Sequence, residues 1–120
     1  MALHMTLEPQ EWLMVGSTRV VNIRDEPVKF HIDGAGPILR QAHTLSETMN
    51  NSAAERVYLS VQKAYLGVEP ALDRYFSLVQ DLLIERPESR DVVQAANVHI
   101  SKGSFYGALR EYRKLVGLRN

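Results

Sequence analysis

The chain has 120 residues with 14 basic and 14 acidic side chains, so its formal net charge at pH 7 is zero. This balance argues against a strong non-specific nucleic-acid binder, which carries an excess of positive charge. The absence of cysteine excludes thiolate zinc sites, redox pairs and thiol nucleophiles. The first residues lack the basic start and apolar core of a signal peptide, and no apolar run reaches the ~18 residues of a membrane span. We therefore expect a soluble, cytoplasmic protein that makes no membrane contact.

The first 45 residues contain several short stretches in which apolar and polar side chains alternate. The alternation is clearest over residues 3–7 and 28–32, and a period of two predicts half-buried strands. Shorter candidate strands cover residues 12–15, 19–23 and 38–39. The segments between them are rich in Pro, Gly and Asp, which favour tight turns. This part of the chain predicts a small antiparallel β-meander.

After residue 50 the apolar period changes to 3.6 residues, which is typical of amphipathic helices. Gly67 and Gly103 are expected to end the first and third of four helices. The second helix has an apolar stripe that includes Phe76. The four helix starts are marked by capping or proline residues, namely Ser52, Pro70, Pro87 and Ser104.

The two halves together predict an α+β fold in which a small N-terminal antiparallel β-meander is followed by a four-helix region. We expect a β subregion over residues 1–45 and a helical subregion over residues 46–120. A chain of this length is typical of one compact domain, so both subregions are expected to belong to it.

The last helix carries the most informative pattern. Phe105, Leu109 and Tyr112 recur at helical spacing and predict a packing stripe. The basic residues Arg110, Arg113 and Lys114 follow at i, i+3 and i+4, which predicts a cluster on one side of the helix. Tyr106 lies off the main stripe and is expected to be exposed. One interpretation is RNA binding, with Tyr106 stacking on an unpaired base and the cations holding phosphates. The other is a solvated basic face that complements the negative end of the helix.

No catalytic, cofactor or metal site is evident from the sequence. The four histidines pair with no other candidate ligand at a recognised metal-site spacing, and His4 and His31 are expected on polar strand faces. The segment Asp33–Pro37 lacks the third Gly and the Lys-Ser/Thr of a phosphate-binding loop, which favours a turn. Asp81 and Glu85 lie one helical turn apart beside arginines, as on a solvated charged face. We therefore expect a protein that is not an enzyme and needs no cofactor.

Four stretches of the chain together resemble a known family. They are residues 1–11, the triplet Ile38-Leu39-Arg40, and residues 54–66 and 106–116. In order, spacing and total length they are similar to the flagellum biosynthesis repressor FlbT family. The resemblance implies a post-transcriptional regulator that associates with the 5′ leader of flagellin mRNA and promotes its decay. It also implies the flagellar regulator FlaF as a counterpart, and it leaves open whether this chain represses or activates.

Two functional hypotheses follow. The first is an RNA-associated regulator of flagellin synthesis, in which the cations and Tyr106 of the last helix bind RNA. The second is a protein-binding adaptor or chaperone-like module acting on FlaF, on flagellin or on another copy of the chain, with indirect effects on mRNA. The candidate RNA-binding residues of the first hypothesis are Tyr106, Arg110, Arg113 and Lys114, supported by Arg40, Arg56 and Lys63.

Overall fold

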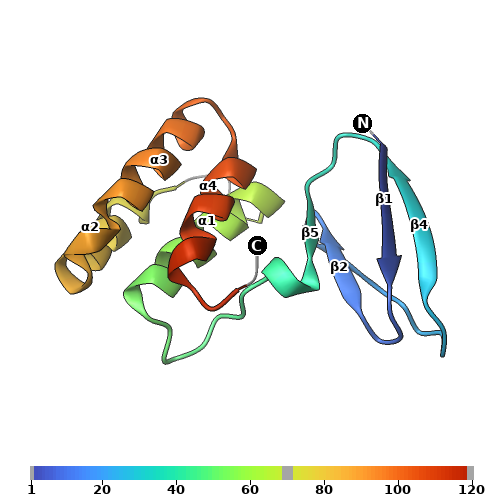
Figure 1. Cartoon of the computed structure of the whole chain (residues 1–120). Coiled ribbons are helices and arrows are strands. Elements are labelled where there is room, and N and C mark those ends of the chain that lie inside the picture. Colours follow the sequence, from blue (N-terminus) through green and yellow to red (C-terminus); the bar gives the residue numbers. More distant parts are fainter. Residues whose placement is uncertain (1, 69–71, 119–120) are drawn as a thin grey trace.

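The computed structural model describes residues 2–68 and 72–118, and in them five strands precede four α-helices (Figure 1). The α+β class is therefore confirmed. The strands are β1 (Ala2–Leu7), β2 (Trp12–Val15), β3 (Thr18–Val21), β4 (Val28–Asp33) and β5 (Ile38–Arg40). The helices are α1 (Ala53–Leu66), α2 (Tyr75–Glu85), α3 (Arg90–Ser101) and α4 (Phe105–Tyr112). Short 3-10 turns cover Gln41–His43, Pro87–Ser89 and Arg113–Leu115.

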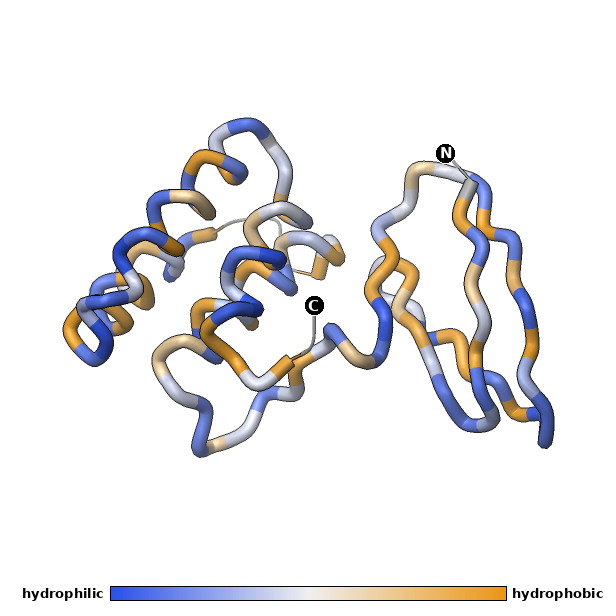
Figure 2. Tube along the Cα trace, viewed as in Figure 1, coloured by the Kyte–Doolittle hydropathy of each residue, from blue (hydrophilic) through white to orange (hydrophobic). Residues whose placement is uncertain are grey.

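The strands form two antiparallel sheets, β1–β4 and β3–β2–β5. Along β1 and β4 the hydropathy alternates from residue to residue, so each strand has one apolar side (Figure 2). The apolar sides meet in a small core around Met5, Leu7 and Leu13. Asn22 fixes one of the turns, because its buried side-chain amide donates to the carbonyls of Leu7 and Glu26.

The strand order refines the expected meander. Among the strands of the described residues, β2 and β3 are the one pair that is consecutive in the chain and hydrogen-bonded, with Trp12 opposite Val21. The first strand pairs instead with β4, and β2 takes β5 as its second partner. The apolar sides of the strands must face each other across a core, and two small sheets achieve this where one flat sheet does not.

The helix ends lie close to where their sequence signals predict them. Ser52 and Glu55 form the capping box of α1, and Gly67 ends this helix in the left-handed conformation at φ 75°. Gly103 at φ 76° separates α3 from α4, whose first turn is capped by the Ser104 hydroxyl. The expected start of the second helix at Pro70 lies outside the described residues, and α2 begins at Tyr75.

A second and larger core lies among the helices. Tyr75 and Tyr112 are both fully buried, their hydroxyls hydrogen-bond to each other, and the Tyr75 hydroxyl also donates to Asn97 at 2.7 Å. Phe76 was predicted on the same apolar stripe but is 70% exposed, because Tyr75 takes the inward position and Phe76 packs only on its edge. The stripe prediction is therefore wrong for Phe76.

The two halves are joined along β5 and α1 (Figure 1). The Tyr65 hydroxyl donates to the carbonyl of Ile38 and accepts from its N–H. The neighbouring Leu39 belongs to the helical core. Gln62 exchanges two hydrogen bonds with the backbone of Leu45, and the Tyr58 hydroxyl donates to the carbonyl of His43. The polar side chains of α1 thus hold the segment that leaves the sheets.

Candidate functional site

Helix α4 presents the residues that the sequence singled out. Its inner side is fully buried through Ala108, Leu109 and Tyr112, so the packing stripe is confirmed for these residues. The opposite side of the helix carries Tyr106 and Arg110 one turn apart. We call the exposed side chains of Tyr106, Arg110 and Lys114 the α4 surface.

Tyr106 is 41% exposed, which confirms the expected exposure. Its ring rests on protein along one side, where the Tyr65 ring centroid lies 5.7 Å away. The guanidinium carbon of Arg113 lies 5.3 Å from the Tyr106 ring centroid, within the range of a cation–π contact. The ring is therefore held in place while part of it faces solvent.

Arg113 was predicted to be exposed, and this is wrong. The residue is only 3% exposed, and its Nε and Nη2 atoms are buried with no hydrogen-bond partner in the structure. Helical side chains lean toward the N-terminus, so Arg113, two turns after Tyr106, leans back onto that ring. Burial raises the pKa of the nearby Tyr58 hydroxyl, and the Arg113 charge opposes that rise. Arg113 thus supports Tyr106 from within the protein.

Arg110 of α4 and Lys114 of the following 3-10 turn remain exposed. Arg110 and Lys114 line a small cavity of about 260 Å³ together with His99 of α3. Lys114 is ion-paired with Glu111 at 2.8 Å, whereas the guanidinium of Arg110 has no partner among the described residues. Arg110 is therefore the cation of the α4 surface that is most available to a ligand.

The close approach of α3 and α4 depends on a glycine. A Cβ atom added to Gly107 would lie 2.4 Å from Nδ1 of His99, so a side chain does not fit there without moving the imidazole. His99 is half-buried against α4, and its Nε2 lies 4.0 Å from the Glu111 carboxylate. Gly107 and His99 thus set the position of the α4 surface relative to α3.

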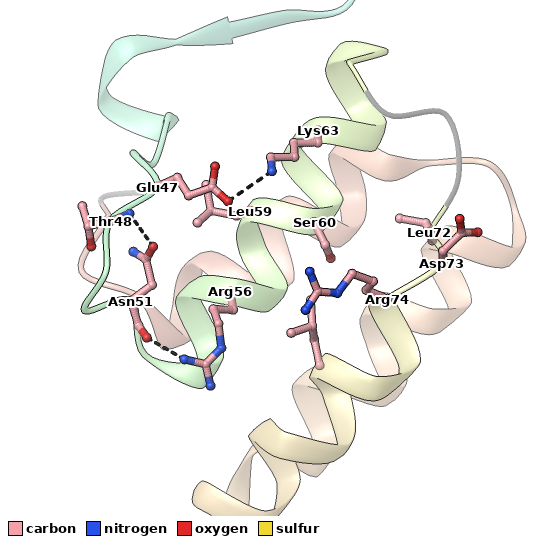
Figure 3. A pocket seen from close by; sticks show the side chains of 11 residues that line it. Glu47, Thr48, Asn51, Arg56, Leu59, Ser60, Lys63, Leu72, Asp73 and Arg74 are labelled. Carbon is pink, nitrogen blue, oxygen red and sulfur yellow. Dashed lines mark hydrogen bonds and ion pairs between the residues drawn. The ribbon is translucent and has the colours of Figure 1, made fainter.

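Arg56 and Lys63, predicted as supporting RNA contacts, lie elsewhere. They point from α1 into a groove of about 580 Å³ between α1, the start of α2 and the preceding loop (Figure 3). On an α-helix their side lies about 140–180° from that of Tyr58 and Tyr65, which face α4 and β5. We call this cavity the α1–α2 groove. Its lining residues are Glu47, Thr48, Asn51, Arg56, Leu59, Ser60, Lys63, Leu72, Asp73, Arg74 and Leu78.

Arg40 is the remaining predicted contact. It is exposed at the end of β5 and lines neither of the two cavities. The predicted residues therefore do not form one site: the α4 surface, the α1–α2 groove and Arg40 are separate, and Arg113 is internal.

Sequence reasoning missed two features that depend on pairing in space. Arg74 joins Arg56 and Lys63 at the groove, although the sequence suggested only a charged residue on a solvated face. His4 and His31 are exposed as predicted, but they lie directly opposite each other on β1 and β4 with ring centroids 4.5 Å apart. Neither feature has a local signal, because each joins residues from different elements.

Two further kinds of feature are absent from residues 2–68 and 72–118. No group of three or more His, Cys, Asp or Glu side chains is placed to hold a metal ion there. Among the same residues, no helix has the length and apolar character to cross a membrane.

Comparison with known proteins gives a consistent result. The family model described as "Flagellar protein FlbT" matches residues 3–119. The chain is 37% identical over 119 residues to the "Probable flagellum biosynthesis repressor protein FlbT 1" of Bradyrhizobium diazoefficiens, covering 97% of this chain and 81% of that protein. It is 36% identical over 118 residues to the "Probable flagellum biosynthesis repressor protein FlbT" of Rhodopseudomonas palustris strains TIE-1 and CGA009, covering 97% of this chain and 93% of those proteins. No match was found among solved structures. The chain therefore belongs to the FlbT family of flagellar proteins.

Proposed function

We propose that this chain represses flagellar synthesis after transcription, by associating with the 5′ leader of flagellin mRNA and shortening the lifetime of that message. The names of its relatives, probable flagellum biosynthesis repressors, support the regulatory part of the proposal. The observation that carries the RNA part is the α4 surface, where a half-exposed tyrosine ring stands one turn from an arginine with no described partner.

The chemistry of the α4 surface suits single-stranded RNA. Unpaired bases stack on aromatic rings, and the accompanying phosphates bind cations. Tyr106 supplies the ring, and the buried Arg113 contacts that ring from the protein side. Arg110 supplies the free guanidinium, and Lys114 adds a second charge that is partly neutralised by Glu111. These contacts position RNA, whereas sequence preference requires contacts to base edges.

A zero net charge is compatible with this proposal if binding is local. Without a broad positive surface, non-specific affinity is low, and the salt dependence reports only a few phosphate contacts. For Arg110 and Lys114 acting on single-stranded RNA, the expected slope of log K against log salt is about −0.7 for each contact.

A mobility-shift titration with the flagellin leader RNA tests the proposal. Tyr106→Ala is expected to weaken binding about tenfold, because stacking of one base is lost. Arg110→Ala is expected to reduce the salt slope by about 0.7. Arg90→Ala is the matched control, since Arg90 is an exposed arginine on α3 outside both cavities. If Tyr106→Ala and Arg110→Ala bind the leader as tightly as Arg90→Ala does, the α4 surface is not the RNA site.

A further inference from the structure

The α1–α2 groove is a second surface with a different chemistry from the α4 surface. Three leucines provide its apolar lining. They are Leu59 of α1, Leu78 of α2 and Leu72, which precedes α2. The groove opens to solvent along one side, where the loop before α1 forms its rim (Figure 3). Its volume of about 580 Å³ accommodates several side chains of a bound partner.

The cations of the groove differ in how they are held. Lys63 is ion-paired with Glu47 at 3.3 Å, and Arg56 donates to the carbonyl of Asn51 at 2.8 Å. The guanidinium of Arg74 makes no hydrogen bond or ion pair with any described residue. Figure 3 shows this side chain reaching from the start of α2 toward α1, across the groove. The lining also contains two acidic side chains, Glu47, which is paired with Lys63, and Asp73, so a negative group of a ligand is expected at Arg74 rather than throughout the groove. The leucines favour a ligand that is apolar on one side.

Two features of the groove decide which kind of ligand fits. Its lining contains no aromatic side chain, so a nucleic-acid base would find no stacking partner there. Its open side leaves part of any bound ligand facing solvent, whereas small-molecule sites bury most of the ligand surface. A chain segment that crosses the groove matches both features, because it needs to bury only one of its sides.

We propose that the α1–α2 groove binds an amphipathic helix of a partner protein, with apolar side chains over the three leucines and a carboxylate paired with Arg74. Helix-in-groove recognition uses apolar anchors at i, i+3, i+4 and i+7, which fit a trough between two helices. The carboxylate fixes the direction and register of the helix through a charge-assisted hydrogen bond. The proposal stands independently of RNA binding, because it involves no residue of the α4 surface.

Fluorescence anisotropy with the full chain and a labelled synthetic helix tests this proposal. The probe is a peptide of about 15 residues, long enough to be partly helical in water, with Leu at the anchor positions and Glu beside them. A peptide with Lys in place of each Glu is the matched control for charge. The variants are Arg74→Glu, which reverses the free cation, and Ser60→Trp, which fills the groove from α1. Arg90→Glu makes the same charge change outside the groove.

We expect the acidic peptide to bind and the Lys peptide to bind at least about tenfold more weakly. Arg74→Glu and Ser60→Trp should each weaken the acidic peptide by about tenfold or more, while Arg90→Glu leaves its Kd unchanged. Circular dichroism and thermal unfolding of each variant identify any loss of folding. The leader-RNA affinity should be the same for Arg74→Glu and Arg90→Glu.

Several outcomes would overturn the proposal. One is that the acidic peptide fails to bind, or that both folded groove variants bind it like the unmodified chain. Another is that Arg74→Glu abolishes leader-RNA binding, which would make the groove an RNA surface. A third is that the protein self-associates through the groove, detected by sedimentation as a dimer that Arg74→Glu dissociates. A failure of RNA binding with retained peptide binding would instead contradict only the proposed function of the α4 surface.

Discussion

The α4 surface and the α1–α2 groove are both basic, yet they differ in shape and in the side chains around their cations. The α4 surface projects an aromatic ring, and its strongest candidate cation, Arg110, stands beside that ring. The groove is concave, its cations surround leucines, and aromatic rings are absent from its lining. Positive charge by itself therefore does not identify a ligand, because the neighbouring apolar groups decide between a flat base and an apolar side chain.

Leu109→Ala should have the largest effect on stability and should impair both surfaces alike. Leu109 is fully buried in the core that α1, α2 and α4 share, so both surfaces depend on it. We expect the free energy of unfolding to fall by about 2–5 kcal/mol, measured by urea denaturation. Ile84→Ala is the control, since Ile84 is 80% exposed on α2 and should change stability by about 0.5 kcal/mol or less. If Leu109→Ala lowers the free energy of unfolding as little as Ile84→Ala does, the inference that Leu109 belongs to a shared core is wrong.

Gly107→Ala should affect one surface only. The added methyl group would collide with the His99 ring, which must move and change the approach of α3 to α4. We expect a loss of about 1–3 kcal/mol, reduced by the better helix propensity of alanine, together with weaker RNA binding. Binding of the acidic peptide at the groove should not change. Equal losses of RNA affinity at the α4 surface and of peptide affinity at the groove would show that the two surfaces are coupled through α4.

Alkaline pH should weaken the helical core that supports both surfaces. Burial raises the pKa values of Tyr58, Tyr65, Tyr75 and Tyr112 above the ordinary value of 10.0. Because these pKa values are raised in the folded chain, the unfolded chain loses its tyrosine protons at a lower pH than the folded chain does. Stability is therefore fully present below pH 10 and falls above it, by up to about 1.4 kcal/mol per pH unit for each such tyrosine.

The alkaline prediction is checked by denaturant unfolding at a series of pH values on both sides of pH 10. Tyr112→Phe removes one titrating group, so its stability should fall less steeply with pH than that of the unmodified chain. An unchanged slope in this variant would show that Tyr112 does not contribute to the alkaline loss.

Arg113→Met should have the smallest effect on stability. It should distinguish whether Arg113 supports the Tyr106 ring or contacts RNA itself. The arginine is buried with two unpartnered guanidinium nitrogens, and an apolar residue of similar length avoids that desolvation cost. We expect the free energy of unfolding to stay the same or to rise by up to about 2 kcal/mol. RNA affinity should decrease several-fold because Tyr106 loses its cation–π contact. A strong loss of stability would show that the buried charge is needed for folding.

Much of the fold could be predicted because its signals are local. The capping box of Ser52 and Glu55, and the glycines at 67 and 103, placed the helix ends within a few residues. The order of the strands could not be predicted, since alternation identifies the apolar side of a strand but not its partner. The inward turn of Tyr75 and the exposure of Phe76 show the same limit on a helix, where adjacent aromatic residues competed for one inner position.

The candidate site was predicted less completely. Exposure of Tyr106 followed from its place off the apolar stripe of α4, and that expectation was correct. Arg113 shared the basic spacing of its neighbours, but the ring of Tyr106 and the adjacent α1 enclosed it. For Arg74 the sequence suggested only a solvated charged face, because its relation to Arg56 and Lys63 arises only where α2 meets α1.

The α+β class, the helix ends, the inner side of α4 and the family of the chain could be predicted from the sequence, because they depend on patterns within short segments. Which cations are free, which are buried and which lie together became known from the three-dimensional arrangement. Those properties depend on distances between side chains from different elements, and local spacing contains no information about them. The basic residues consequently divide between the α4 surface, for which we propose RNA, the α1–α2 groove, for which we propose a protein helix, and the two residues Arg40 and Arg113, which belong to neither.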